Sequence, residues 1–393
     1  MVLTPPAATR AATKDLAPAV ITGLAGSFPL IARPAEPYGP LEDRVAALVD
    51  SLPASSEHAP ATVAMLATKT LNQAALLASE CQRHKEANTI LRHHLSAYTT
   101  QDSLSVPAAV GMLEPVTDLA RLHALVGQTD RAVVWLTRTM HALRTSTRVS
   151  VDRYELPLDR VEVHGEEPDG PRMLGWAGER LLADTVKILT RAGRWSDAVD
   201  LISRNGGPGA RLTETRQAMI TTHLVAGEPV TARHYLAGAQ PTQAWEDEIA
   251  SCLTVLAAEP GDRAQAVEAM LATFQRSTPA PGMVGYRTRY GIAVTRLAHA
   301  TGHPYAVIAR QVAAEVIEAG DGGAARDVLR AVGGCLSRTD ITTLERSVTR
   351  SGLHAGALAG HHLSRLRVAT QHALQLLRAA LDHEHADRTT TGS

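Results

Sequence analysis

The sequence is poor in aromatic side chains and contains no long apolar run. Phenylalanine, tyrosine and tryptophan make up 3% of the 393 residues, although apolar residues as a whole make up 45%. A core of alanine, leucine and valine suits closely packed helices and gives little material for a large β-sandwich. So few rings also disfavour nucleic-acid binding by base stacking. Because no run approaches the ~20 consecutive apolar residues of a transmembrane helix, we expect no membrane span.

Cysteine is nearly absent as well. Cys81, Cys252 and Cys335 are far apart and form no Cys-x-x-Cys pair, which fits a reducing compartment. Residues 16–31 are the one stretch that resembles an export signal, but prolines and glycines interrupt it and no Ala-x-Ala site follows. We therefore predict a cytoplasmic protein.

Neither sign of charge dominates. The formal net charge at pH 7 is −1, from 39 Lys and Arg against 40 Asp and Glu, so we expect no long-range attraction to nucleic acid or to anionic membranes. Only four of the cations are lysines. The preference for arginine and alanine resembles the coding bias of GC-rich actinobacteria.

A spaced glycine and alanine motif organises the middle of the chain. An apolar helical run is followed by a glycine, four mostly polar residues and an alanine that opens the next run. Three such pairs follow one another at intervals of 34 residues, and a fourth lies upstream: Gly193/Ala198, Gly227/Ala232 and Gly261/Ala266, with Gly127/Ala132 before them. Glycine tolerates a left-handed helix end, and alanine lets two helix backbones approach closely. The motif therefore predicts repeated two-helix hairpins.

This unit resembles a tetratricopeptide repeat (TPR), and it is similar to the helical sensor halves of actinobacterial regulators. The resemblance implies an all-α fold, a right-handed α-solenoid of TPR-like hairpins that binds a peptide or helix on its concave surface. The copies are divergent, because the Trp and Leu-Gly signature of the family's first helix is absent and only the third copy has a nearby proline, Pro279.

The expected organisation follows the chain in order. Residues 1–40 form an irregular N-terminal arm that packs on the first repeat through Val20, Ile21, Leu30 and Ile31. Helical hairpins follow over residues 41–148, an acidic insertion over 149–171, the TPR-like array over 172–350, a C-terminal capping helix over 351–383 and a disordered tail over 384–393. Prolines in the insertion exclude a regular helix there: Pro157, Pro168 and Pro171.

No motif indicates catalysis or metal binding. The sequence contains no Gly-x-Ser-x-Gly, no phosphate loop and no His-Glu-x-x-His. Adjacent histidines such as His361 and His362 are expected to point to different helix faces. His123 and His223 lie four residues before motif glycines, which favours a packing role. We predict no catalytic residue, metal or cofactor.

Two charged clusters are candidate binding sites. The insertion carries an acidic set that would attract a basic peptide or a basic enzyme face: Glu162, Glu166, Glu167 and Asp169. Arg92, His93 and His94 form a basic strip that would hold an acidic peptide or a phosphate. A solvated loop and a solvated helix face are the alternative interpretations.

These features favour a non-catalytic scaffold or adaptor for a protein or peptide partner, such as an enzyme of a bacterial biosynthetic pathway. A small-molecule sensor related to regulator C-terminal halves is the second hypothesis. A divergent helical enzyme whose pocket is fed by the insertion is the third. Homo-oligomerisation is left open.

Overall fold

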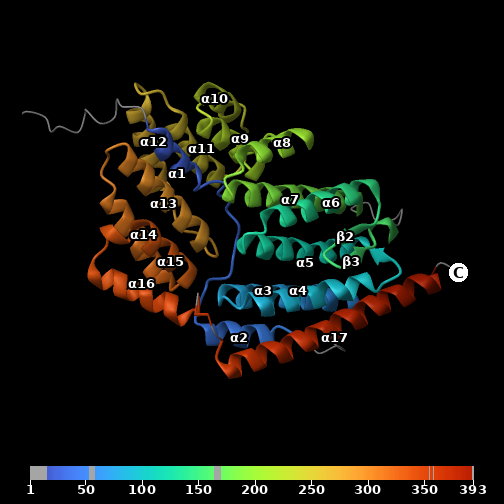
Figure 1. Ribbon diagram of the computed structural model, residues 1–393. Helices are drawn as coiled ribbons and strands as arrows, with labels where there is room; N and C mark the ends of the chain where they lie inside the picture. Colours follow the sequence, from blue (N-terminus) through green and yellow to red (C-terminus); the bar gives the residue numbers. More distant parts are fainter. Residues whose placement is uncertain (1–15, 53–57, 163–169, 354, 357, 392–393) are drawn as a thin grey trace, which may run out of the picture. The chain divides into compact units, whose positions relative to one another are not determined.

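The structure is almost entirely helical. A computed structural model describes residues 16–52, 58–162, 170–353, 355–356 and 358–391 (Figure 1). Over these residues it contains seventeen α-helices and four strands of two or three residues each. The helical class predicted from composition and periodicity is confirmed. None of the described helices is long and apolar enough to cross a membrane.

The chain forms two compact units, each built from separate stretches. Unit 1 comprises Met1–Pro40 and Gly193–Ser351, and unit 2 comprises Leu41–Ala192 and Gly352–Ser393. The elements of unit 1 are α1 (Pro18–Ala25), α8 (Trp195–Arg204), α9 (Glu214–Val225), α10 (Pro229–Ala237), α11 (Ala244–Ala257), α12 (Arg263–Arg276), α13 (Val284–Ala300), α14 (Ala306–Ala319), α15 (Gly322–Val332), the 3-10 turn η3 (Gly333–Cys335) and α16 (Arg338–Arg350). The elements of unit 2 are α2 (Leu41–Asp50), α3 (Pro60–Glu80), α4 (His84–Thr99), β1 (Leu104–Ser105), α5 (Val106–Leu125), α6 (Thr129–Thr145), β2 (Val149–Val151), β3 (Tyr154–Leu156), the 3-10 turn η2 (Leu158–Arg160), β4 (Val161–Glu162), α7 (Gly170–Arg191) and α17 (Gly360–Thr391).

The motif glycines end helices in the expected way. Gly127, Gly193 and Gly227 have φ angles of 87°, 73° and 77°, in the left-handed region that glycine adopts without a Cβ penalty. After two of them, the next backbone N–H donates to a carbonyl five residues back, from Gln128 to His123 and from Glu228 to His223, both at 2.8 Å. This bond satisfies a helix-terminal carbonyl and turns the chain sharply. The motif alanines that follow are fully buried: Ala132, Ala198 and Ala232.

The copy at Gly261 differs from the others. Gly261 is outside the positive-φ region, and the preceding helix α11 already ends at Ala257. The following helix keeps the motif's register, beginning two residues after the glycine, but Ala266 is half-buried and Val267 is fully buried beside it. Conversely, Gln82 adopts the left-handed conformation, with φ 59°, in the hairpin that lacks the glycine.

In unit 2 each helix packs on its neighbours in sequence, and alternate helices also touch. Helices α3, α4, α5, α6 and α7 contact one another in order, and α3 also contacts α5, which in turn contacts α7 (Figure 1). We call α3, α5 and α7 the first helices of unit 2, because α3 and α5 each begin a tightly turned pair. Helix α17 packs on α2, α3 and α4 and continues to Thr391, so the predicted disordered tail is helical over most of its length.

The described part of the insertion is folded into unit 2. Strands β2 and β3 form an antiparallel hairpin, with Val149 opposite Leu156, that contacts α6 and α4. Val149, Val151 and Leu156 are buried, which agrees with the alternation of apolar residues in this stretch. Pro171 lies in the first turn of α7, where a proline is tolerated because its missing N–H would have no helical partner.

Unit 1 follows the same packing scheme, with the N-terminal arm added. Its pairs are α9/α10, α11/α12, α13/α14 and α15/α16, and the first helices of successive pairs, α9, α11, α13 and α15, contact one another. The expectation that the arm packs on the first repeat is wrong. Helix α1 contacts α9 and α13 instead, and Leu24, Phe28 and Leu30 are buried in the unit 1 core.

Candidate binding site

The first helices of unit 2 form a pocket. Its volume is about 560 Å³, and its lining comes mainly from α3, α5 and α7, with smaller contributions from α4 and α6. Most of the lining is apolar, including Ala75, Leu122 and Ile188. At its rim, Leu76 on α3 and Leu125 on α5 are 52% and 65% exposed. Leucines left open beside a cavity are typical of a surface that another molecule covers.

An ion-pair network lies in the polar part of the pocket. Arg121 donates from Nη1 to Asp118 Oδ1 at 2.8 Å and from Nη2 to Asp184 Oδ1 at 2.7 Å. Burial raises the pKa of Asp118 although Arg121 opposes the shift, and the carboxylates of Glu114 and Asp184 add to it. Burial alone would lower the pKa of Arg121, but the carboxylates of Asp184 and Asp118 raise it overall. The network therefore keeps a charged guanidinium in a mostly apolar site.

Asn72 contributes a polar atom to the pocket that has no partner among the described residues. It lines the cavity from α3, and its Oδ1 is buried with no hydrogen-bond partner among the described residues. An amide oxygen without a partner costs free energy in a buried place unless water or a bound molecule supplies a donor.

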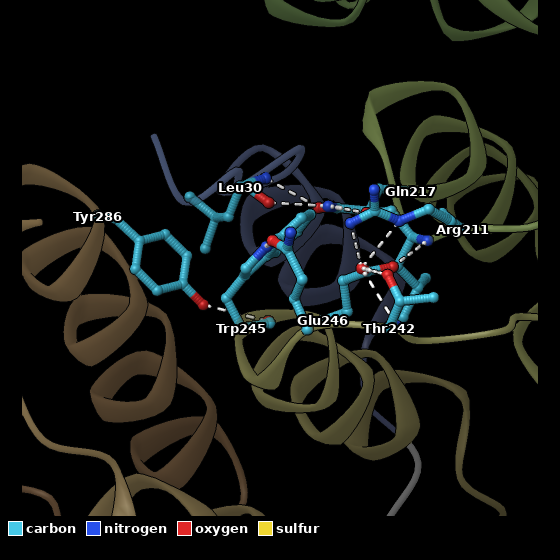
Figure 2. Close-up of polar contacts among 9 residues, drawn as sticks. Leu30, Arg211, Gln217, Thr242, Trp245, Glu246 and Tyr286 are labelled. Carbon is cyan, nitrogen blue, oxygen red and sulfur yellow. Dashed lines mark hydrogen bonds and ion pairs between the residues drawn. The ribbon is translucent and has the colours of Figure 1, made fainter. Parts of the chain in front are cut away.

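The corresponding face of unit 1 holds a segment of the chain itself. Gln217 on α9 accepts a hydrogen bond from the backbone N–H of Leu30 and donates one to its carbonyl, both at 2.8 Å, and also donates to the carbonyl of Leu212 at 2.7 Å (Figure 2). Three residues further along the arm, Arg33 Nη2 lies 2.6 Å from Glu214 Oε1. The arm then reaches α15, where Tyr38 N–H donates to Asp321 Oδ2 at 3.0 Å. An extended segment thus lies along the first helices of unit 1.

A buried carboxylate beside Gln217 holds the loop that precedes α9. Glu246 is fully buried and accepts hydrogen bonds from Arg211, from the backbone N–H of Leu212 at 3.0 Å and from Thr242 Oγ1 at 3.2 Å (Figure 2). Burial alone would raise the pKa of Glu246, but hydrogen bonds from Arg211 and from the backbone N–H groups of Leu212 and Thr242, together with the charge of Arg211, lower it overall. The carboxylate therefore stays ionised and fixes Leu212, whose carbonyl Gln217 also contacts.

Asn72 and Gln217 occupy equivalent repeat positions. Asn72 lies ten residues before the left-handed Gln82, and Gln217 lies ten residues before the left-handed Gly227. Asp118 and Asp184 are likewise equivalent, since each lies nine residues before its glycine. In the sequence these polar residues can be found by their distance before a turn, which is ten residues for one pair and nine for the other. The glycine and alanine spacing by itself locates only the hairpins.

The predicted basic strip does not form one surface. Arg92 makes an ion pair with Asp152 at 2.9 Å, and His94 is fully buried between core residues, while only His93 of the three is exposed. The reason is helical geometry, because adjacent residues on α4 point in directions about 100° apart. His94 therefore belongs to the core of unit 2.

The predicted acidic set is only partly within the described residues. Glu162 lies in β4, paired in parallel with Ser105 of β1, and Glu166, Glu167 and Asp169 lie outside the described residues. Binding of a basic partner there stays a prediction.

The two histidines before motif glycines have structural contacts. His123 Nδ1 lies 2.7 Å from Gln128 Oε1 and its ring meets Trp135 edge-on. His223 Nδ1 lies 2.7 Å from Glu228 Oε2 and its ring stacks on Tyr235. Both rings therefore brace the turn that follows them, in agreement with the predicted packing role.

Comparisons with known proteins identify no family. No protein-family model matches the chain, and no curated protein matches it. The geometry of the pocket and of the arm is therefore the basis for a function.

Proposed function

We propose that the chain is a helical-repeat binding protein whose unit 2 pocket holds an extended apolar segment of a partner protein. The observation that carries the proposal is the cavity of about 560 Å³ on the first helices of unit 2, with Leu76 and Leu125 exposed at its rim. Covering a leucine completely contributes roughly 1.5–3 kcal/mol. The proposal includes a right-handed α-solenoid of the TPR type, in which first helices form the concave face.

The contact between the N-terminal arm and unit 1 suggests how a partner segment would bind to unit 2. In unit 1 a carboxamide on a first helix pairs with both the N–H and the carbonyl of Leu30, whose side chain is 4% exposed. In unit 2 the carboxamide of Asn72 stands at the equivalent position with its oxygen unpaired among the described residues. With the Asn72 carboxamide turned toward the cavity that it lines, a partner's backbone N–H would satisfy that oxygen while an apolar side chain next to it enters the pocket.

The ion pairs of Arg121 disfavour a charged occupant of the pocket. Arg121 already has two carboxylate partners, at 2.8 Å and 2.7 Å, so an incoming charge would have to displace one of them and lose a charge-assisted hydrogen bond. The favoured occupant is therefore an uncharged stretch with leucine, isoleucine, methionine or phenylalanine as anchor. Whether the partner is an enzyme or its substrate peptide, it must present such a stretch.

A small-molecule sensor is the second candidate, and the pocket's volume favours it. Ligand pockets commonly measure ≈ 300–1,000 Å³ and are mostly apolar with a few placed polar groups, a description that this pocket meets. The two candidates differ in what contacts Asn72, a peptide backbone in the first and a polar group of the ligand in the second.

A peptide selection tests the proposal. A random linear peptide library displayed on phage is selected against the full chain, and enriched peptides are synthesised and titrated by fluorescence anisotropy. We expect enriched peptides with an apolar anchor. Leu125→Asp should weaken their binding at least about tenfold, since it places a charge where the anchor packs, and Asn72→Leu should weaken it several-fold through loss of the acceptor.

The matched control is Val134→Asp, which changes another exposed apolar residue of unit 2, on α6 and outside the pocket lining. Peptides whose affinity is unchanged by Leu125→Asp, or is lowered equally by Val134→Asp, would contradict the proposed site. Absence of enriched peptides, combined with small apolar molecules whose thermal stabilisation of the protein depends on Leu125, would favour the sensor.

A further inference from the structure

Two adjacent histidines and a glutamate outside the pocket lining converge on the surface of unit 2. His361 and His362 lie in the first turn of α17, and Glu42 lies in the first turn of α2. His361 Nε2 is 3.6 Å and His362 Nδ1 is 3.4 Å from the same Glu42 oxygen, Oε2. The two imidazole centroids are only 3.9 Å apart. The expectation that these rings point to different faces is therefore wrong.

The two distances from the histidine nitrogens to Glu42 Oε2 fit a tetrahedral metal site. With zinc-to-ligand bonds of about 2.0–2.1 Å, the ligand atoms of a tetrahedral site lie about 3.4 Å apart. Both histidine nitrogens are near that distance from Glu42 Oε2, and all three ligand atoms lie within 4.8 Å of one another. Two imidazoles and one carboxylate are also a ligand set that zinc uses where a fourth position stays open to water.

The burial of His362 supports the same conclusion. His362 is 9% exposed, and its Nδ1 lacks a hydrogen-bond partner among the described residues although it points toward Glu42. A buried, unpaired imidazole nitrogen loses its hydration without compensation unless something binds it. Arg365 Nη1 donates to the other oxygen, Glu42 Oε1, at 2.6 Å. That bond orients the carboxylate and leaves Oε2 facing the histidines, as groups around metal ligands commonly do.

We propose that Glu42, His361 and His362 bind a divalent transition-metal ion, with Zn²⁺ as the fitting member and a water molecule as fourth ligand. His361 contributes Nε2, His362 contributes Nδ1 and Glu42 contributes one oxygen. The ion joins α2 to α17, two helices that already pack on each other within unit 2. The positive charge of Arg365 repels a nearby cation and therefore lowers the affinity of the site for the metal ion.

The test is a calorimetric titration of the metal-stripped full chain with Zn²⁺, with Co²⁺ as a spectroscopic probe. We expect one strong equivalent of Zn²⁺, a raised unfolding temperature on binding, and the visible absorption of tetrahedral Co²⁺. His361→Ala and Glu42→Gln should each lower the affinity at least about tenfold, because even groups behind the ligands commonly change affinity by 10–100-fold. Both side chains are more than half exposed, so these variants preserve the fold.

His372→Ala is the matched control, since His372 is exposed on the same helix and outside the cluster. The chain has 17 histidines, so weak binding at scattered surface sites is to be expected. Zn²⁺ binding that is equally strong in wild type, His361→Ala and Glu42→Gln would overturn the proposal. So would a Co²⁺ spectrum typical of octahedral coordination.

Discussion

Acidification should destabilise the protein through His94, a fully buried histidine of α4. Neither ring nitrogen of His94 has a hydrogen-bond partner among the described residues, and burial lowers the pKa of this imidazole to about 3. In the unfolded chain the pKa returns to the ordinary value of about 6.5. Between these two pKa values the unfolded state binds a proton that the folded state cannot, so stability falls as the pH falls below about 6.5.

The size of the effect follows from the difference between the two pKa values. For each pH unit below 6.5, the free energy of unfolding decreases by about 1.4 kcal/mol until the pH approaches the pKa of His94 in the folded state. Between pH 7 and pH 5 the His94 contribution to the free energy of unfolding should decrease by about 2 kcal/mol. That is a large share of the 5–15 kcal/mol that typically stabilises a folded protein. Above pH 7 His94 should contribute no pH dependence.

Urea unfolding at pH 7, 6 and 5 measures this contribution as a difference between variants. His94→Leu removes the titrating group while filling its place, so the variant should lose about 2 kcal/mol less than wild type over this range. The control is His93→Leu, which removes the exposed neighbour and should follow the wild-type profile. Equal pH profiles for wild type and His94→Leu would refute the reasoning, as would an NMR titration in which the His94 ring protonates near pH 6.5 in the folded state.

Two further predictions concern unit 1. Gln217→Leu should lower the free energy of unfolding by roughly 2–4 kcal/mol, because it leaves the N–H and carbonyl of Leu30 without partners. Hydrogen exchange should become faster over residues 26–36, and unchanged protection there would show that Gln217 does not hold the arm. Gly227→Ala should cost about 1–2 kcal/mol in thermal or chemical unfolding, because φ there is 77°. Gly261→Ala, whose glycine is outside that region, should cost little, and equal costs would contradict the assigned turn geometry.

The hairpin turns were predictable from the sequence because their causes are local. A glycine that ends one helix and an alanine five residues later are both requirements of a single turn, and the structure shows Gly127, Gly193 and Gly227 meeting them. Gly261 matches the pattern without the turn, because the spacing cannot distinguish a glycine at a helix end from one in a longer loop. Gln82 shows the converse, since its neighbours impose a left-handed conformation on a residue that does not favour it.

The position of the arm and the composition of the pocket were not predictable in the same way. Leu30 meets Gln217 across 187 residues, and Glu42 meets His362 across 320 positions of sequence. No sequence pattern near these residues indicates either contact. The buried state of His94 could be inferred only from which face of α4 turns inward, and the polar and apolar residues around it left that face ambiguous. Sequence periodicity specifies a helix's inner side only after its neighbours are known.

The same repeat position carries a hydrogen-bonded carboxamide in unit 1 and a carboxamide with an unpaired oxygen in unit 2. A carboxamide ten residues before a turn is satisfied in unit 1, where Leu30 pairs with Gln217 and its side chain is buried. At the same position in unit 2 the described residues offer Asn72 no hydrogen-bond partner for Oδ1, and leucines beside it stay exposed. An unpaired buried amide oxygen costs free energy, and exposed leucines forgo the free energy of burial, so a covering segment would be stabilising at both places. A segment resembling the arm, supplied by another protein, would meet both requirements at once.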